Sequence, residues 1–332
     1  AGVSTHGLKI VSSAVVKPPL KWIIATPCCS PLTPVCLSRS ESMITGSIVA
    51  LVTPMHPDGA IDWQALARLI EHHIESGTAG LGVVGTTGES PTLTVPEHCE
   101  VIRFAVEQAG GRIPVVAGTG GNSTHEAIEL TVSAAEAGAD YSLSVTPYYN
   151  RPTQHGLFEH FQAVARAVNL PIILYNVPGR TGCDLLNETV VRLSQIDNIV
   201  AIKDATGDVQ RGSRLIEAVP DGFAVFSGDD ATALELMRHG AKGNVSVTAN
   251  IAASDMAAMC NLALSGEWEA AADIDATLAT LNDLLFSEAN PIPVKWAMAH
   301  RGMIDSGIRL PLTPLSEACR APLEKAMETY FA

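Results

Sequence analysis

The sequence predicts an α/β protein built as a closed (β/α)8 TIM barrel with a C-terminal helical extension. From Met43 onward, strand-like apolar runs alternate with amphipathic helical patterns eight times, and the connections between them are short. Apolar residues make up 47% of the chain and aromatic residues only 5%, as expected of parallel strands buried beneath helices. A doubly wound open sheet usually stops at about five to seven strands, so this alternation favours the barrel.

Eight segments have the length and β-branched composition of buried strands. In chain order they are 44–52, 79–84, 113–117, 141–145, 171–175, 199–203, 223–226 and 244–247. Four helical patterns then follow without another strand, at 252–265, 267–287, 291–301 and 316–330. We therefore predict a barrel over residues 43–266 and a helical extension over residues 267–332.

Several of the predicted helices have clear end signals. The pattern at 62–76 places its apolar residues on one side and is followed by Gly77, a common helix terminator. Two segments, Thr94-Val-Pro-Glu97 and Ser123-Thr-His-Glu126, have the form of a capping box. These signals support the alternation on which the barrel prediction rests.

Residues 1–42 differ in composition from the rest, and we exclude them from the fold prediction. They hold four basic residues against one acid, Glu41, and are rich in Ser, Thr and Pro. An acid-poor leader of this kind suggests an organellar transit peptide, although its prolines interrupt any amphipathic helix. A translated upstream segment or an expression-derived extension is the alternative, because Met43 opens the first strand-like run.

Charge and composition narrow the classes of partner. The net charge of −14 argues against nucleic acid or an anionic membrane as a partner. No apolar run approaches the ~20 residues that span a bilayer. Seven cysteines are scattered without Cys-x-x-Cys pairs, which favours reduced thiols and a cytoplasmic location, or a plastid if residues 1–42 are a transit peptide.

One lysine stands where chemistry is expected in a barrel. Lys203 ends the apolar run 199–203, and functional residues gather at the carboxyl ends of barrel strands. An amine attacks a carbonyl only in its neutral form, which apolar surroundings favour. Lys203 is therefore a candidate Schiff-base nucleophile, the alternative being an ordinary lysine whose ammonium reaches solvent.

Polar loops follow the second and fourth predicted strands. In Gly85-Thr-Thr-Gly-Glu-Ser90, glycines let backbone N–H groups and hydroxyls approach a carboxylate or oxyanion, although such loops are also ordinary turns. The loop 146–152 carries adjacent tyrosines, Tyr148 and Tyr149. Either phenol could transfer a proton, stack at a subunit interface or simply pack on the surface.

The ends of three further strands add polar groups. Tyr175 ends the fifth strand, close to Lys203 on the next, and Arg180 offers a planar fork suited to a substrate carboxylate. The seventh and eighth strands end in the segments 227–230, which contains Gly228, and 245–250, which begins at Val245; their backbone carbonyls could surround a substrate. A lysine, phenols, hydroxyls and one arginine suit imine chemistry.

Other chemistries find little support in the sequence. The ten histidines form no Glu-x-x-His or His-x-His arrangement on a convincing element, so no metal site is predicted. A serine hydrolase would need a Gly-x-Ser-x-Gly elbow, which is missing. The segment Gly118-Thr-Gly-Gly121 lacks the full dinucleotide-binding spacing and is interpreted as a turn.

At this point the motifs resemble a known family. The segment Gly85-Thr-Thr-Gly-Glu89, the Tyr-x-Asn-x-Pro opening at Tyr175 and the strand-end Lys203 resemble the pyruvate-dependent class I aldolase superfamily. Three further segments are similar to the dihydrodipicolinate synthase family in particular: Thr146-Pro-Tyr-Tyr-Asn-Arg-Pro152, Asn176-Val-Pro-Gly-Arg-Thr-Gly182 and Asn290-Pro-Ile-Pro-Val-Lys295. The resemblance runs from about Met43 to the C-terminus.

The resemblance implies an activity and a role for each matching residue. The activity is condensation of pyruvate with L-aspartate 4-semialdehyde to 4-hydroxy-tetrahydrodipicolinate in lysine and diaminopimelate biosynthesis, with no cofactor. Lys203 would form the imine with pyruvate. The other implied assignments are a proton relay of Tyr175, Thr86 and Tyr149, with Tyr149 supplied by a neighbouring subunit, and substrate contacts by Thr87, Arg180, Val245 and Gly228.

The resemblance also implies assembly and regulation. It implies a homotetramer built as a dimer of dimers, with lysine as an inhibitory effector at the tight interface. The matching effector positions are Ser90, Leu93, His98, Asn122, Glu126 and Tyr148. Val95 and Pro91 depart from the pattern of lysine-sensitive relatives, which leaves feedback inhibition open.

Two other functions remain as alternatives at this point. A sister aldolase, such as N-acetylneuraminate lyase or a keto-deoxy-sugar-acid aldolase, would use the same lysine on another aldehyde, and Arg180 argues against it. A non-catalytic pyruvate or amino-acid sensor could retain the barrel without turnover, because a fold does not fix a function. The intact lysine, tyrosines and Thr86 argue against that alternative.

Overall fold

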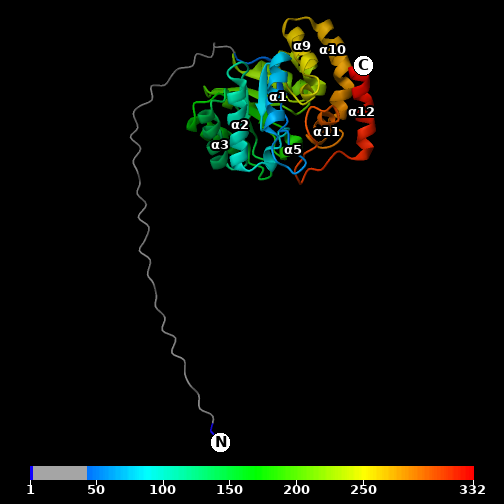
Figure 1. Ribbon diagram of the computed structural model, residues 1–332. Helices are drawn as coiled ribbons and strands as arrows, with labels where there is room; N and C mark the ends of the chain where they lie inside the picture. The colour runs from blue at the N-terminus through cyan, green and yellow to red at the C-terminus, as the bar shows by residue number, and fades with distance from the viewer. Residues whose placement is uncertain (3–42) are drawn as a thin grey trace. The chain divides into compact units, whose positions relative to one another are not determined.

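The computed structural model describes residues 1–2 and 43–332, and residues 43–332 belong to one compact unit. In this part of the chain, eight parallel strands close into a barrel in chain order, which confirms the predicted fold (Figure 1). The strands are β1 Gly46–Ala50, β2 Gly80–Val83, β3 Val115–Gly118, β4 Tyr141–Val145, β5 Ile172–Asn176, β6 Ile199–Asp204, β7 Ala224–Ser227 and β8 Gly243–Ser246. The predictions made for residues 1–42 fall almost entirely outside the described residues.

Helices follow each strand and surround the barrel. They are α1 Trp63–Glu75, α2 Val95–Ala109, α3 Thr124–Ala137, α4 Gln154–Ala167, α6 Asn187–Leu193, α7 Val209–Ala218 and α8 Ala233–Arg238, with α9 Ala253–Leu264 after β8. A short helix that the sequence did not predict, α5 Pro178–Thr181, lies in the loop between β5 and α6. Short 3-10 turns occupy Ser90–Thr92, Asp230–Thr232 and Thr248–Asn250.

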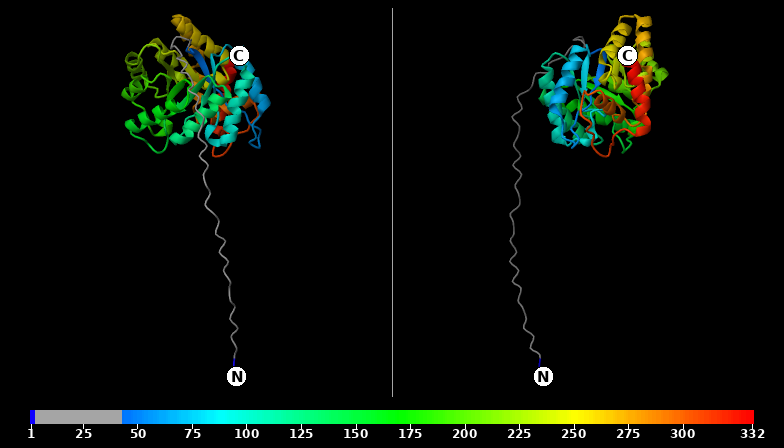
Figure 2. Two further views of the ribbon diagram at one scale, coloured as in Figure 1. Left: turned by 90° about the vertical axis from the view of Figure 1, so that its left-hand side faces the viewer. Right: turned by 45° about the vertical axis from the view of Figure 1, so that its right-hand side comes forward.

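The C-terminal extension consists of three helices. They are α10 Trp268–Leu284, α11 Ile292–His300 and α12 Glu317–Phe331, each within a few residues of its predicted range. Helix α10 packs between α9 and α12, and these three helices lie together on one side of the barrel (Figures 1 and 2). The division between residues 266 and 267 stays a prediction, because the extension packs continuously onto the barrel helices.

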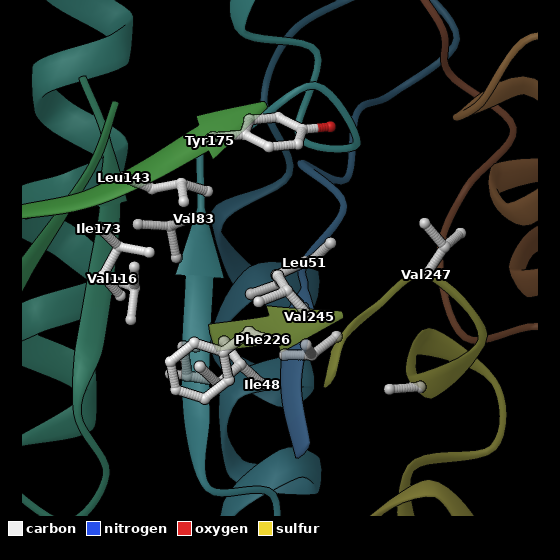
Figure 3. Packing of buried hydrophobic residues seen from close by; sticks show 14 of the residues in the cluster. Ile48, Leu51, Val83, Val116, Leu143, Ile173, Tyr175, Phe226, Val245 and Val247 are labelled. Atoms are coloured by element: carbon white, nitrogen blue, oxygen red, sulfur yellow. The ribbon is translucent and has the colours of Figure 1, made fainter. Parts of the chain in front are cut away.

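The barrel interior is filled by large apolar side chains from several strands. Figure 3 shows Ile48, Val83, Val116, Leu143, Ile173, Phe226 and Val245 converging inside the barrel, with the ring of Tyr175 at one end. Alternate residues of a strand point to opposite faces, so the next residues along face the helices. A site can therefore form at the end of this apolar core where the Tyr175 ring lies.

The predicted first strand is too long by two residues at each end. Gly46 has a φ of +100°, which marks the start of the regular pairing. At the other end, Leu51 N–H still donates to the Gly82 carbonyl, but Val52 N–H donates to Asn250 Oδ1 at 3.1 Å. A side chain from beyond β8 thus replaces the next ladder bond, which no local sequence pattern reveals.

The helix-end predictions are largely confirmed. Asp62 accepts a hydrogen bond from Ala65 N–H and caps α1, and both bonds of the Thr94 capping box are present. Ser123 accepts from the Glu126 backbone N–H, but the Glu126 carboxylate lines a pocket. The second predicted box is therefore formed on one side only.

The cysteines and the helix lengths can be compared with the expectations from composition. Cys99, Cys183, Cys260 and Cys319 are free thiols in the described part of the chain. Within residues 43–332, no helix combines the length and the apolar character that crossing a membrane requires.

Candidate active site

Lys203 lies inside the barrel mouth, at the end of β6. Its side chain is only 6% exposed and lines a cavity of about 200 Å³. The register pairs Lys203 with Tyr175 of β5, and the Lys203 Nζ lies 4.3 Å from the centre of the Tyr175 ring. A buried amine beside a phenol is an arrangement suited to attack on a carbonyl with proton transfer nearby.

Gly228 packs directly against the aliphatic stem of Lys203. A Cβ atom at position 228 would lie 2.8 Å from Lys203 Cε and 2.8 Å from the Ala205 Cβ. These distances are shorter than any ordinary carbon contact, so a side chain there would displace the lysine. Glycine at this position leaves the space in which the lysine stem lies.

The loop after β2 begins with a strained residue. Val84 has a φ of +47°, a left-handed conformation that costs a β-branched residue about 1–3 kcal/mol. The loop then runs through Thr86 and Thr87, which both line the cavity with Lys203. Thr53 Oγ1 donates to the Gly88 carbonyl at 2.7 Å and holds the far end of this loop.

The C-terminal extension fixes the same loop from outside the barrel. Glu89 is fully buried and forms an ion pair with Lys295 of α11, and its second oxygen accepts from Arg309 N–H at 3.2 Å. Burial lowers the pKa of Lys295, while its carboxylate partner opposes that shift. Removing either partner would leave an uncompensated buried charge, so this pair locks the loop in place.

Asn290 links two of the predicted substrate contacts. Its side-chain Nδ2 donates to Thr87 Oγ1 at 2.9 Å, and its backbone carbonyl accepts from Arg180 Nη2 at 3.1 Å. Sequence reasoning used Asn290 only as part of a motif and gave it no role. The available signal was that Asn290 is a polar residue immediately before the predicted helix at 291–301 and opens a long matching motif.

One cavity collects most of the predicted site residues. Its lining includes Thr86, Thr87, Tyr175, Arg180, Lys203, Gly228 and Val245, together with residues that were not predicted: Thr206, Asp229, Val247, Phe286 and Asn290. These residues come from the ends of β2, β5, β6, β7 and β8 and from the C-terminal extension. Residues far apart in the sequence thus share one small space at the carboxyl ends of the strands.

Tyr149 is not brought to this cavity within one chain. Its side chain is 89% exposed, and its backbone has a left-handed φ of +73°. Bonds from Tyr149 N–H to the Thr181 carbonyl and from Asn150 Nδ2 to the Asn122 carbonyl hold the loop. A tightly held loop that presents an exposed aromatic ring fits contact with another molecule better than random surface packing.

A second pocket, of about 450 Å³, adjoins the first and shares Thr86, Tyr175 and Arg180 with it. It is lined by five of the six predicted effector positions: Ser90, Leu93, His98, Glu126 and Tyr148. The sixth, Asn122, does not line it. The divergent Pro91 and Val95 also line this pocket.

Burial controls the charge of this second pocket. It lowers the pKa of His98, whose Nε2 lies 2.7 Å from the Gly118 carbonyl oxygen; the bond to this carbonyl and, after it, the nearby Glu126 only partly oppose the shift. Burial and the same carboxylate raise the pKa of Tyr148. At neutral pH, the His98 side chain near Glu126 is therefore uncharged.

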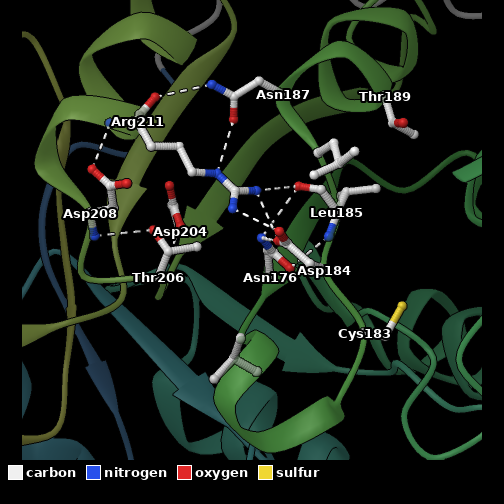
Figure 4. A network of polar contacts seen from close by, with 12 residues as sticks. Asn176, Cys183, Asp184, Leu185, Asn187, Thr189, Asp204, Thr206, Asp208 and Arg211 are labelled. Atoms are coloured by element: carbon white, nitrogen blue, oxygen red, sulfur yellow. Dashed lines mark hydrogen bonds and ion pairs between the residues drawn. The ribbon is translucent and has the colours of Figure 1, made fainter.

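The outward faces of the same strand ends carry a polar network (Figure 4). Arg211 of α7 donates to both carboxylate oxygens of Asp184 at 2.9 Å and to the Leu185 carbonyl at 2.7 Å. Asn176, the last residue of β5, donates to Asp184 Oδ1 at 2.9 Å and accepts from Leu185 N–H. This network fixes the segment after β5, which contains Arg180.

No group of three or more His, Cys, Asp or Glu side chains within residues 43–332 is arranged to hold a metal ion.

Comparisons with known proteins agree with this geometry. A sequence profile of the dihydrodipicolinate synthetase family matches residues 43–330. The chain is 58% identical over 285 residues to a 4-hydroxy-tetrahydrodipicolinate synthase from Pseudomonas syringae pv. syringae, covering 86% of this chain and 98% of the relative. It is 59% identical over 287 residues to the enzyme of that name from Marinobacter nauticus, with the same coverage.

Solved structures give the same result. The chloride-inhibited dihydrodipicolinate synthase from Acinetobacter baumannii, complexed with pyruvate, matches with a TM-score of 0.86 and 57% identity, over 87% of this chain and 99% of that one. The enzyme from Cyanidioschyzon merolae with lysine bound matches with a TM-score of 0.84 and 40% identity, over 87% and 98%. A barrel with an internal lysine and a family match that extends through its C-terminal helices lead to one conclusion: the chain belongs to the dihydrodipicolinate synthetase family.

Proposed function

We propose that the protein is a lyase-type synthase that condenses pyruvate with L-aspartate 4-semialdehyde to 4-hydroxy-tetrahydrodipicolinate, in lysine and diaminopimelate biosynthesis. The observation that carries this proposal is the buried Lys203 amine, 4.3 Å from the Tyr175 ring centre in a cavity also lined by Thr86 and Thr87. The names of the close relatives support the same reaction.

In the proposed chemistry, the protonated imine formed on Lys203 is the electron sink. The neutral Lys203 amine attacks the keto carbon of pyruvate, water leaves, and an imine forms. The protonated imine accepts the electron pair of a methyl C–H bond, so that loss of this proton gives an enamine. The enamine carbon then attacks the aldehyde carbon of the semialdehyde, and the new alkoxide takes a proton. The amino group of the semialdehyde portion next attacks the imine carbon, the C–N bond to Lys203 breaks, and the cyclic product leaves with the lysine amine restored. No external cofactor is required.

Proton transfer is assigned to a relay of Tyr175, Thr86 and Tyr149. Tyr175 and Thr86 line the cavity of their own chain, whereas the exposed Tyr149 would enter the cavity of a neighbouring subunit. This assignment requires at least a dimer, and we propose a homotetramer formed by two such dimers. A phenol that gives and takes protons in a water-poor cavity contributes roughly 10²–10⁴-fold to a rate.

The two substrate carboxylates are assigned to different ends of the cavity. Thr87 would bind the pyruvate carboxylate through its hydroxyl and backbone N–H, with the Gly228 and Val245 backbones nearby. Arg180 would bind the semialdehyde carboxylate, because its guanidinium forms paired bonds with such groups. Its position at the shared edge of both pockets supports this role.

Lysine is proposed as an effector of the second pocket. The carboxylate of Glu126, beside an uncharged His98, offers a partner for an ammonium group. The relative from Cyanidioschyzon merolae was solved with lysine bound, which supports this ligand class. A cytoplasmic location is proposed, or a plastid if residues 1–42 act as a transit peptide.

Borohydride trapping tests the proposed function. The protein is incubated with pyruvate and borohydride, and the modified peptide is mapped by mass spectrometry. We expect a reduced pyruvate adduct on Lys203, and turnover with the semialdehyde but not with sugar aldehydes. If the adduct is missing from Lys203, the aldolase assignment is wrong; an adduct without any turnover would indicate the sensor.

A further inference from the structure

We propose that Asn290 is a positioning residue that sets the direction of the Thr87 hydroxyl, so that this hydroxyl donates its hydrogen bond into the cavity. The inference rests on the proposed function, in which Thr87 binds the pyruvate carboxylate. Asn290 belongs to the segment between α10 and α11 and therefore comes from the C-terminal extension. The extension would thus act on substrate binding through a barrel residue.

The contact between the two residues is buried. Asn290 Nδ2 lies 2.9 Å from Thr87 Oγ1, and the two side chains are only 6% and 4% exposed. Both residues line the cavity that contains Lys203. The Asn290 Oδ1 atom has no hydrogen-bond partner among the described residues, so the bond to Thr87 is the contact that orients this amide.

The direction of this bond has a chemical consequence. An amide NH₂ group can only donate, whereas a threonine hydroxyl has one proton and two lone pairs. Once the Thr87 oxygen accepts from Asn290, its own proton is available to another acceptor. Among the described residues, no protein group accepts that proton. A hydroxyl held as a donor in a small cavity suits an anion such as a carboxylate.

Asn290 touches the two predicted carboxylate contacts through different atoms. The bond to Thr87 comes from the side chain, while the bond from Arg180 goes to the backbone carbonyl. Truncating the side chain removes the first bond and leaves the second in place. The substitution should therefore weaken binding of pyruvate but not of the semialdehyde.

The experiment measures both substrates in Asn290→Ala. The pyruvate concentration that gives half-maximal borohydride trapping at Lys203 should rise about tenfold, as expected when a charge-assisted hydrogen bond loses its orientation. The KM for the semialdehyde should change by less than about twofold. If the alanine variant does not fold, Asn290→Ser replaces it, because the serine side chain is too short to reach Thr87. The same rise in the pyruvate requirement and the same unchanged semialdehyde KM are expected.

A matched control separates this effect from general destabilisation. Asn282 of α10 is equally buried and accepts a hydrogen bond from Thr248 Oγ1 at 2.7 Å, but neither residue lines the cavity. Asn282→Ala removes the same atoms and should leave half-saturation by pyruvate unchanged. An equal rise in both variants would overturn the inference, because the effect would then be structural.

A double substitution tests whether Asn290 acts through Thr87. In the Thr87→Val background, adding Asn290→Ala should cause no further rise in the pyruvate requirement. Additive effects would show that Asn290 acts independently and would overturn the inference. Failure to trap pyruvate on Lys203 in the unaltered protein would instead refute the proposed function, so the two failures are distinguishable.

Discussion

The ends of β5 and β6 carry two neighbouring residue pairs with opposite surroundings. Tyr175 and Lys203 are register partners that face the cavity, where the Lys203 amine has the Tyr175 ring as its neighbour. The next pair, Asn176 and Asp204, faces outward, where Asn176 joins the network of Asp184 (Figure 4). One step along each pleated strand thus separates the cavity-facing pair, which is available to react, from the outward pair, which is held by hydrogen bonds.

The comparison predicts that inward substitutions change chemistry and outward substitutions change stability. Rigid support on the outer face allows the inner groups to keep their geometry without strong bonds of their own. Four substitutions test this division.

The largest expected effect follows removal of the inward amine. Lys203→Ala should lower kcat/KM by about 10⁴-fold or more, because the covalent intermediate can no longer form. The unfolding temperature should not fall, since the substitution removes a buried amine that has no ion-pair partner within residues 43–332. Steady-state kinetics and thermal unfolding measure the two quantities, and substantial residual activity would contradict the assignment of Lys203.

A smaller chemical effect is expected at Arg180, whose side chain is exposed at the cavity edge. Arg180→Ala should lower kcat/KM for the semialdehyde by about 100-fold, mainly through a higher KM, because a paired carboxylate contact is lost. Trapping of pyruvate on Lys203 should be unaffected. Unchanged semialdehyde kinetics would refute the role of Arg180.

On the outer face, Arg211→Ala should act mainly on stability. It removes the partner of Asp184 and should lower the free energy of unfolding by about 2 kcal/mol, a value reduced for the partial exposure of Asp184. Urea unfolding measures this change. The free energy of unfolding should fall less in Arg211→Lys than in Arg211→Ala. If half-saturation by pyruvate shifts strongly while stability does not change, the division between faces is wrong.

The smallest effect is expected at Asp204. Burial raises the pKa of this carboxyl above its ordinary 3.8, with the bonds from Thr206 opposing the shift. A raised carboxyl pKa means that the folded state binds its proton more tightly, so this group costs stability as the pH rises through its folded-state pKa. Asp204→Asn should therefore stabilise the protein slightly at pH 7, by at most about 0.5 kcal/mol. Comparison of unfolding temperatures at pH 4 and pH 7 checks the sign: the gain should vanish at the lower pH.

The sequence was sufficient to predict the barrel and much of the site because both depend on strand position. Apolar runs located the eight strands, and the residues at the ends of those runs, including Tyr175 and Lys203, meet in one cavity. Alternation along a strand also follows directly from the chain order. These features arise from local patterns that repeat in a regular architecture.

Long-range side-chain contacts could not be predicted in this way. The pairing of Glu89 with Lys295 and the bond from Asn290 to Thr87 join the second strand loop to the C-terminal extension across more than 200 residues. The left-handed conformation of Val84 is equally invisible, since a β-branched residue normally avoids it. The predicted place of Tyr149 in the relay depends on a second subunit and stays a prediction.

The bonds from Asn290 and Lys295 to the second strand loop also affect the order in which the molecule can become active. A chain is synthesised from its N-terminus, and all eight strands precede these two residues. A nascent barrel could therefore close before the groups that secure its threonine loop have left the ribosome. Completion of the catalytic centre would therefore be one of the last events in biogenesis.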